Sequence, residues 1–161
     1  TDQIDLRVPG IEKLRLTPAQ INNGEVHTAL RREFALLEKD EVYLNERGFK
    51  WETFVDGGRR WLLVREYALL DGYDHTVVDI AIDIPPSYPR AEIDMFHCHP
   101  HLALKSGRSI GETSGRTRID ARTFQQWSRH LNGVTRWNPN TDSVMTHIAV
   151  VEAALLKEIG E

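Results

Sequence analysis

The sequence has one cysteine, Cys98, among its 161 residues. A single thiol cannot form an internal disulfide, and the chain has no C-x-x-C pair of the kind that holds many structural zinc ions. The absence of a disulfide agrees with a reducing compartment, so we expect a cytoplasmic protein. It also leaves Cys98 free either for thiol chemistry or for a place in the core.

Long apolar runs and an excess of basic residues are missing as well. No stretch approaches the roughly 20 apolar residues that a helix needs to cross a bilayer, and the first ten residues, TDQIDLRVPG, are too polar for a signal peptide. The chain has 20 Lys and Arg against 24 Asp and Glu, a net charge of -4. Because nucleic acids and anionic membranes attract clustered Lys and Arg, we expect neither as a partner.

The chain divides into a short arm and one domain. Prolines, glycines and asparagines interrupt residues 1–24, which have no sustained hydrophobic period, so this segment is predicted to be an extended N-terminal arm. Residues 25–161 are enough for one globular domain with its own core. Apolar side chains near helical spacing predict an amphipathic helix over residues 26–40, and the pattern leaves open whether residues 41–47 continue it.

Four β-strands are predicted to follow. Two β-rich runs flank the sequence DGG at residues 56–58, whose glycines supply the positive φ that a tight hairpin requires. Residues 76–83 alternate apolar and polar side chains, and residues 92–96 form a fourth strand beyond a proline-rich bend. We therefore expect a four-stranded antiparallel meander.

The C-terminal part is predicted to hold a loop and two helices. Residues 105–118 are polar and contain three glycines, which indicates a long surface loop of the kind that often carries function. Residues 121–131 are predicted to form a short helix capped by Asp120, and residues 144–159 a longer amphipathic one. The predicted fold class is α+β, with the helices segregated from the sheet.

Cys98 lies in the segment FHCHPH at residues 96–101, with three of the seven histidines. A metal site is one interpretation, but in a continuing strand the histidines would share one face and Cys98 would point to the other. An inert, buried thiol is the second. The third is a thiolate nucleophile, with His99 and His101 lowering the thiol pKa or donating to an oxyanion. The residue types alone leave all three open.

A set of short motifs surrounds this segment in a characteristic order. Beyond the predicted helix and meander, the set comprises Tyr88-Pro89, His99-Pro100 and a Trp137-Asn-Pro139 turn before the last helix. The order resembles that of ubiquitin-conjugating enzymes over about residues 25 to 159. The resemblance implies a UBC-like fold for residues 25–161.

Finer motifs resemble the divergent bacterial branch of that family, which is encoded beside ubiquitin-like proteins, activating enzymes and JAB-type deconjugating peptidases. They are Asp94-Met95-Phe96, the Leu-x-x-x-Gly-Arg pattern at 104–108, QWSRH at 126–130, and Trp137 with Thr146-His147. The arm adds a further likeness, because residues 4–12 resemble the closing strand and tail of a bacterial ubiquitin-like domain. An unrelated extended arm is the alternative.

The resemblance implies a conjugating enzyme of a defence-type operon. Cys98 would accept a ubiquitin-like protein as a thioester from an activating enzyme and pass it to an amine on a target, while His101 and His99 assist. A JAB-type peptidase would act in the same pathway. No cofactor is expected in this chain, because activation by ATP takes place on the partner enzyme.

Two positions depart from the family pattern. The His-Pro-Asn tripeptide reads HPH at residues 99–101, and the imidazole N–H of His101 could donate where the asparagine would. Where the eukaryotic family has its cysteine, this chain has Gly111. Either the nucleophile is Cys98, or the domain is an inactive UBC-fold scaffold that binds a ubiquitin-like protein or an activating enzyme.

Four other residues are weaker candidates for the same site. Arg129 and His130 could face Cys98 from the predicted short helix, although packing and surface ion pairs are the simpler role. Asp120 could take a proton from an attacking amine if it is not a helix cap. His147, at the start of the last helix, is expected to make a structural hydrogen bond.

Overall fold

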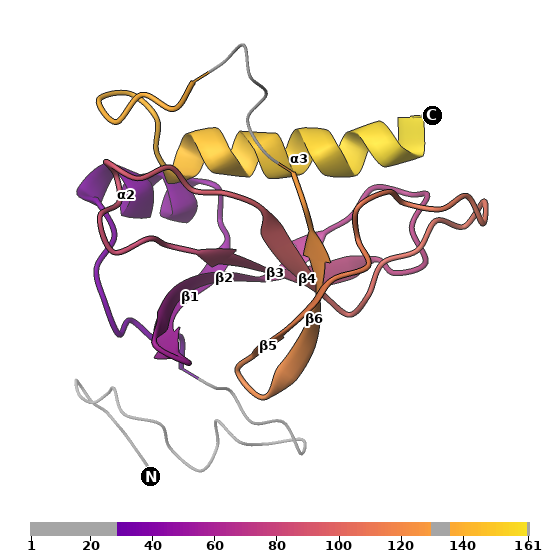
Figure 1. Cartoon of the computed structure of the whole chain (residues 1–161), viewed down its shortest axis with the longest axis horizontal. Helices are drawn as coiled ribbons and strands as arrows, with labels where there is room; N and C mark the ends of the chain where they lie inside the picture. The colour runs from indigo at the N-terminus through magenta and orange to yellow at the C-terminus, as the bar shows by residue number, and fades with distance from the viewer. Residues whose placement is uncertain (1–28, 130–135, 161) are drawn as a thin grey trace, which may run out of the picture.

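The computed structural model describes residues 29–129 and 136–160. In these ranges six strands form one antiparallel sheet in the order β1-β2-β3-β4-β6-β5, with α2 and α3 on one side of it (Figure 1). The elements are α2 (Glu38–Glu46), β1 (Lys50–Asp56), β2 (Arg59–Ala68), β3 (Val77–Asp83), β4 (Phe96–His99), β5 (Arg116–Ile119), β6 (Arg122–Trp127) and α3 (Val144–Gly160). The α+β class is as predicted. No helix of the described residues is long and apolar enough to cross a membrane.

The sheet is buried on both faces. One core lies between the sheet and the helices, and α3 contributes to it the buried side chains Val144, Ile148, Val151 and Leu155. A second core lies on the opposite face, because neighbouring residues of a strand point to opposite sides. Its members come from both ends of the sheet: Phe54, Trp61, Leu63, Ala81, Ile119 and Phe124. The sheet must therefore curl until the β5–β6 hairpin reaches the β1–β2 hairpin.

Three predicted elements agree with the structure. The β1–β2 hairpin turns at Gly57 and Gly58, whose φ angles of 61° and 77° lie in the left-handed region that glycine adopts most easily. β3 covers all but the first residue of the predicted strand at 76–83. α3 begins where the predicted final helix begins and ends one residue later.

The predicted first helix is wrong over residues 29–37, which contain no helix. Its last residues, 38–40, form the first turn of α2, which continues through the stretch that the sequence pattern left open. Residues 31–33 are extended because they pair with β1. Thr53 of β1 donates its N–H to Arg31 O at 2.9 Å, and Glu33 donates its N–H to Thr53 O at 2.9 Å. These bonds place residues 31–33 alongside the outer edge of β1. Residues 26–28 of the predicted helix lie outside the described residues.

The fourth strand lies further along the chain than predicted. β4 begins at Phe96, where the predicted strand at 92–96 ends, and runs to His99. Met95 has a φ of 63°, which an extended strand cannot contain, so pairing with β3 begins only after it. The FHCH segment is thus itself a strand.

The strands β1 to β4 lie next to one another in chain order, and two further strands, β5 and β6, extend the sheet beyond the predicted four. The predicted short helix at 121–131 is wrong over its described residues, 121–129, which contain β6. β5 lies at the end of the predicted 105–118 loop and pairs with β6. Asp120 and Ala121, with φ angles of 54° and 64°, form the two-residue turn between them. Phe124 and Trp127 are three residues apart, which suggested a helix, but in β6 they point to opposite faces and enter different cores.

The turn predicts a stabilising substitution. Ala121 is exposed and holds a backbone conformation that costs an L-residue about 1 kcal/mol or more, so Ala121→Gly should raise the free energy of unfolding by about 0.5–1 kcal/mol. Urea unfolding measures the change. Gly57→Ala, at a φ of 61° with open space around the added methyl, should lower stability. If Ala121→Gly leaves the protein no more stable, Ala121 is not strained.

Candidate functional site

Cys98 lies in the middle of the sheet, beneath the helices. In β4 it pairs with Ile80 of β3 on one side and with Gln125 of β6 on the other. Its side chain belongs to the core between sheet and helices and is 0% exposed. Because that apolar environment disfavours the thiolate, burial raises the pKa of Cys98 well above its ordinary value.

The segment after β4 covers the region around Cys98. Gln125 holds both backbone groups of Leu102: its Oε1 accepts the Leu102 N–H at 3.0 Å, and its Nε2 donates to Leu102 O at 3.1 Å. Leu104 also forms an isolated bridge with Tyr73. Leu102, Leu104 and Tyr73 are buried in the same core as Cys98. Any reaction at the sulfur therefore requires part of this packed core to open.

The neighbouring histidines do not contact the thiol. His97 points to the opposite core, where its ring packs edge-on against Trp61 at 5.4 Å, and burial lowers the pKa of its imidazole. His99 lies with its Nδ1 3.1 Å from Thr123 O. His101 is exposed. Within the described ranges, no hydrogen bond joins Cys98 Sγ to any of them, and no group of three or more His, Cys, Asp and Glu is arranged to hold a metal ion.

The loop after the covering segment is open at the position that Gly111 occupies. A Cβ atom built on Gly111 would meet no atom within 4 Å, and the residue is exposed. Nearby, Thr113 Oγ1 donates to Ile110 O at 2.9 Å, and Ile110 packs against the core. A side chain at position 111 would therefore be freely accessible, unlike the thiol of Cys98.

Two motifs that are far apart in the sequence meet beside α3. Trp137 donates its indole N–H to Pro89 O at 2.8 Å, and its ring lies 6.4 Å from that of Tyr88. The Tyr88 hydroxyl accepts the N–H of Val144, the first residue of α3, at 2.9 Å and donates to the buried carboxylate of Asp40 at 2.7 Å. The peptide bonds Tyr88-Pro89 and His99-Pro100 are both cis.

The family model for prokaryotic E2 family E matches residues 36–158, about three quarters of the chain. The chain belongs to this family. Searches of curated proteins and of solved structures found no match. Membership confirms the resemblance to bacterial ubiquitin-conjugating enzymes and indicates a conjugating-enzyme-like role.

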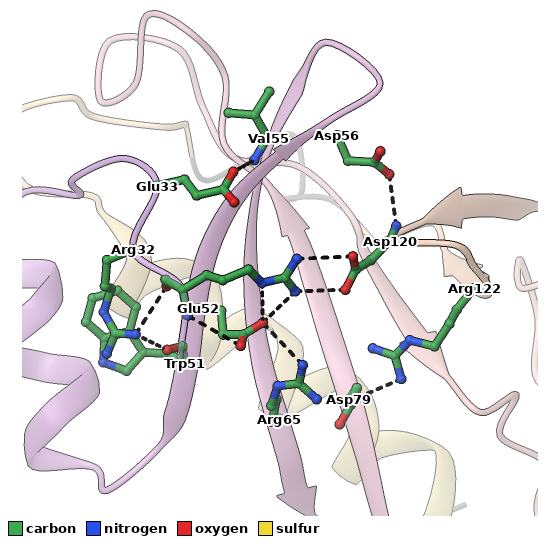
Figure 2. Close-up of polar contacts among 11 residues, drawn as sticks. Arg32, Glu33, Trp51, Glu52, Val55, Asp56, Arg65, Asp79, Asp120 and Arg122 are labelled. Atoms are coloured by element: carbon green, nitrogen blue, oxygen red, sulfur yellow. Dashed lines mark hydrogen bonds and ion pairs between the residues drawn. The ribbon is translucent and has the colours of Figure 1, made fainter. Parts of the chain in front are cut away.

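In this E2-family domain, Asp120 is neither a helix cap nor an unpaired base. Figure 2 shows it beside the β1–β2 hairpin, where its N–H donates to Asp56 Oδ2 at 2.9 Å. Its carboxylate accepts hydrogen bonds from both terminal nitrogens of Arg31, at 3.1 and 2.7 Å. This hydrogen bond with Arg31 is the main reason why the pKa of Asp120 is lowered.

Sequence reasoning missed the other partner of Arg31. Glu52, on β1, is 0% exposed and lies 2.7 Å from Arg31 and 3.3 Å from Arg65. Burial favours its neutral form, but the hydrogen bond from Arg31 and the charge of Arg65 outweigh it and lower the pKa of Glu52. In the sequence Glu52 is one polar residue of a predicted strand and gives no sign of its partners. The cluster of Glu52 with Arg31, Arg65 and Asp120 forms only in the folded sheet (Figure 2).

The remaining candidates have structural contacts. Arg129 follows β6 and pairs with Glu158 of α3 at 3.3 Å. His147 Nε2 lies 2.7 Å from Met95 O, and its hydrogen-bonding role is confirmed. His130 lies outside the described residues. The assistance of His99 and His101 at Cys98 stays a prediction.

Burial of Cys98 predicts slow thiol labelling. A water-soluble thiol reagent should react with the native protein at least about a hundredfold more slowly than with the urea-unfolded chain, because Sγ is reached only by opening the fold. The absorbance of the chromophore that the reagent releases on reaction measures the labelling rate.

The control is Gly111→Cys in a Cys98→Ala background. Its thiol should react at nearly the unfolded rate, because position 111 is open. Rapid labelling of Cys98 in the native protein would mean that the covering segment opens readily.

Proposed function

We propose that this chain is the E2-like binding component of a prokaryotic ubiquitin-like conjugation pathway, and that it engages a ubiquitin-like protein and its activating enzyme without carrying the modifier on Cys98. The observation that carries the proposal is the complete burial of the chain's single thiol in a domain of the E2 family. The family supports the pathway and the partners, and the burial supports the non-covalent role.

The chemistry of thioester exchange supports this choice. The attacking group is a thiolate, and its sulfur must reach the carbonyl carbon of the modifier on the activating enzyme. Burial opposes both conditions, because it removes Cys98 Sγ from the surface and raises the pKa of its thiol. The core around Cys98, which includes Leu102 held by Gln125, would have to open first.

Thioester formation at Cys98 is the second candidate. It is favoured by the sequence, because no other residue of the chain carries a thiol, and by the irregular backbone that covers Cys98. If residues 100–104 moved away when an activating enzyme docked, His99 and His101 would lie next to Cys98 in the chain and could serve as donors to the oxyanion. In either candidate a JAB-type peptidase and a defence-type operon form the proposed context.

A test for adducts separates the two candidates. The protein is incubated with the ubiquitin-like protein and activating enzyme encoded beside it and with ATP, and gels are run with and without thiol reductant. We expect the wild-type chain to bind the modifier or the enzyme in a pull-down and to form no reductant-sensitive adduct. A wild-type adduct that Cys98→Ala abolishes would replace the proposal by thioester transfer. Failure to bind either partner would reject both candidates.

The matched variant is Gly111→Cys with Cys98→Ala. It places an accessible thiol where the eukaryotic family has its cysteine, without steric conflict in this structure. If the activating enzyme docks as it does on a conjugating enzyme, this variant should gain a reductant-sensitive adduct. Such a gain would show that the wild-type chain lacks only the accessible thiol.

A further inference from the structure

β5 is an edge strand that is open on its outer side in the described structure. It stands at the end of the strand order and pairs only with β6. Gln126 of β6 donates its N–H to Gly115 O at 2.9 Å, and this bond shows which residues of β5 direct their backbone groups toward β6. In an antiparallel pair, alternate residues direct their backbone groups toward the partner strand, so Gly115, Thr117 and Ile119 face β6. The backbone N–H and C=O of Arg116 and Arg118 therefore point away from the sheet.

The opposite edge of the same sheet shows how such backbone groups are satisfied. At β1, residues 31–33 run alongside the strand, and Thr53 exchanges backbone hydrogen bonds with Arg31 and Glu33. For β5 no backbone segment within residues 29–129 and 136–160 does the same. An extended segment that paired there would satisfy the outward groups of Arg116 and Arg118.

The side chains on this edge are basic. Arg116 and Arg118 are both exposed, and neither has a carboxylate partner among the described residues. Within residues 29–129 and 136–160, the Arg116 guanidinium donates to the backbone carbonyls of Thr113 and Gly115. His101 lies close by: desolvation lowers the pKa of its imidazole first, and the positive charge of Arg116 lowers it further. The edge is therefore a positive region on a chain whose net charge is -4.

These charges argue against a second copy of the chain as the occupant. In an antiparallel pairing of β5 with β5, arginines of one copy would lie opposite arginines of the other, and like charges directly opposite across strands are destabilising. Carboxylates at alternate positions of an incoming strand would instead lie next to Arg116 and Arg118.

We propose that the β5 edge binds an extended, acidic segment of a partner protein, which adds a seventh strand to the sheet and places alternate carboxylates against Arg116 and Arg118. The outward backbone groups supply pairing, and the arginines select the charge. This surface lies on the β5–β6 hairpin, so binding there does not depend on the state of Cys98 or on the proposed function.

The test uses a fluorescent peptide with alternating Glu and Val residues. Fluorescence anisotropy measures binding of the peptide to the full chain, and we expect this binding to be saturable. It should weaken as the salt concentration rises, because salt screens charge pairs at an exposed edge. Amide hydrogen exchange should slow at Arg116 and Arg118 when the peptide binds. The same peptide with Lys in place of Glu should not bind. One whose Glu residues are N-methylated should bind at least about tenfold more weakly, because it keeps the charges but lacks the N–H donors that face Arg116 and Arg118.

Three variants test the contributions of charge and backbone pairing at this edge. Arg118→Glu should weaken binding about tenfold or more through charge reversal. Arg118→Pro should abolish it while β5 stays paired with β6, since the lost N–H points outward. Arg90→Glu, a charge reversal at another exposed arginine, should bind as the wild type does. Circular dichroism checks that each variant is folded.

Several results would overturn the proposal. They are the absence of saturable binding, equal binding of the Glu and Lys peptides, unchanged binding by folded Arg118→Glu, and changes in exchange confined to residues away from β5. A dimer in solution that Arg118→Glu disrupts would replace the acidic partner by a second copy of the chain.

Discussion

The strand β4 lies inside the sheet, with His97 and Cys98 paired to a neighbouring strand on both sides, and the character of the whole site depends on this position. Between β3 and β6, alternate residues of β4 enter two different cores, so that Cys98 faces the helices and His97 faces Trp61. The same pairing that stabilises the centre of the sheet removes the thiol from water and keeps His97 on the other face. A strand in this position is suited to structure rather than to exposed chemistry.

The curl of the sheet depends on charged groups as well as on the second core. Arg31 bridges Glu52 of β1 and Asp120 of the β5–β6 turn, and a second pair, Arg122 with Asp79 at 3.0 Å, joins β6 to β3. Because Glu52 is completely buried, its charge is stable there only with its cationic partners Arg31 and Arg65 in place. The cluster thus fixes one end of the β5–β6 hairpin, whose outer edge carries the exposed arginines.

Membership of an E2 family and a buried thiol are compatible once binding and transfer are treated as separate properties. Binding of a modifier or an activating enzyme needs a surface, whereas transfer also needs an accessible nucleophile. The space around Gly111 is open, so a side chain at this position would be accessible without displacing the packed core. The loop containing it is joined to α3 through the pair of Arg108 with Glu158, which ties its position to that helix.

The elements with strong local signals could be predicted from the amino-acid sequence. The glycine turn of the first hairpin, the alternating pattern of β3 and the period of α3 each reflect backbone preference or one buried face, and family motifs indicated the E2 relationship. Tertiary structure decided the rest. β6 has buried side chains on both faces, so its pattern carried no strand period, and residues 29–37 are extended because they pair with β1. Whether Cys98 is exposed was also beyond the sequence, because burial depends on the strands and the covering segment around it rather than on its neighbours in the chain.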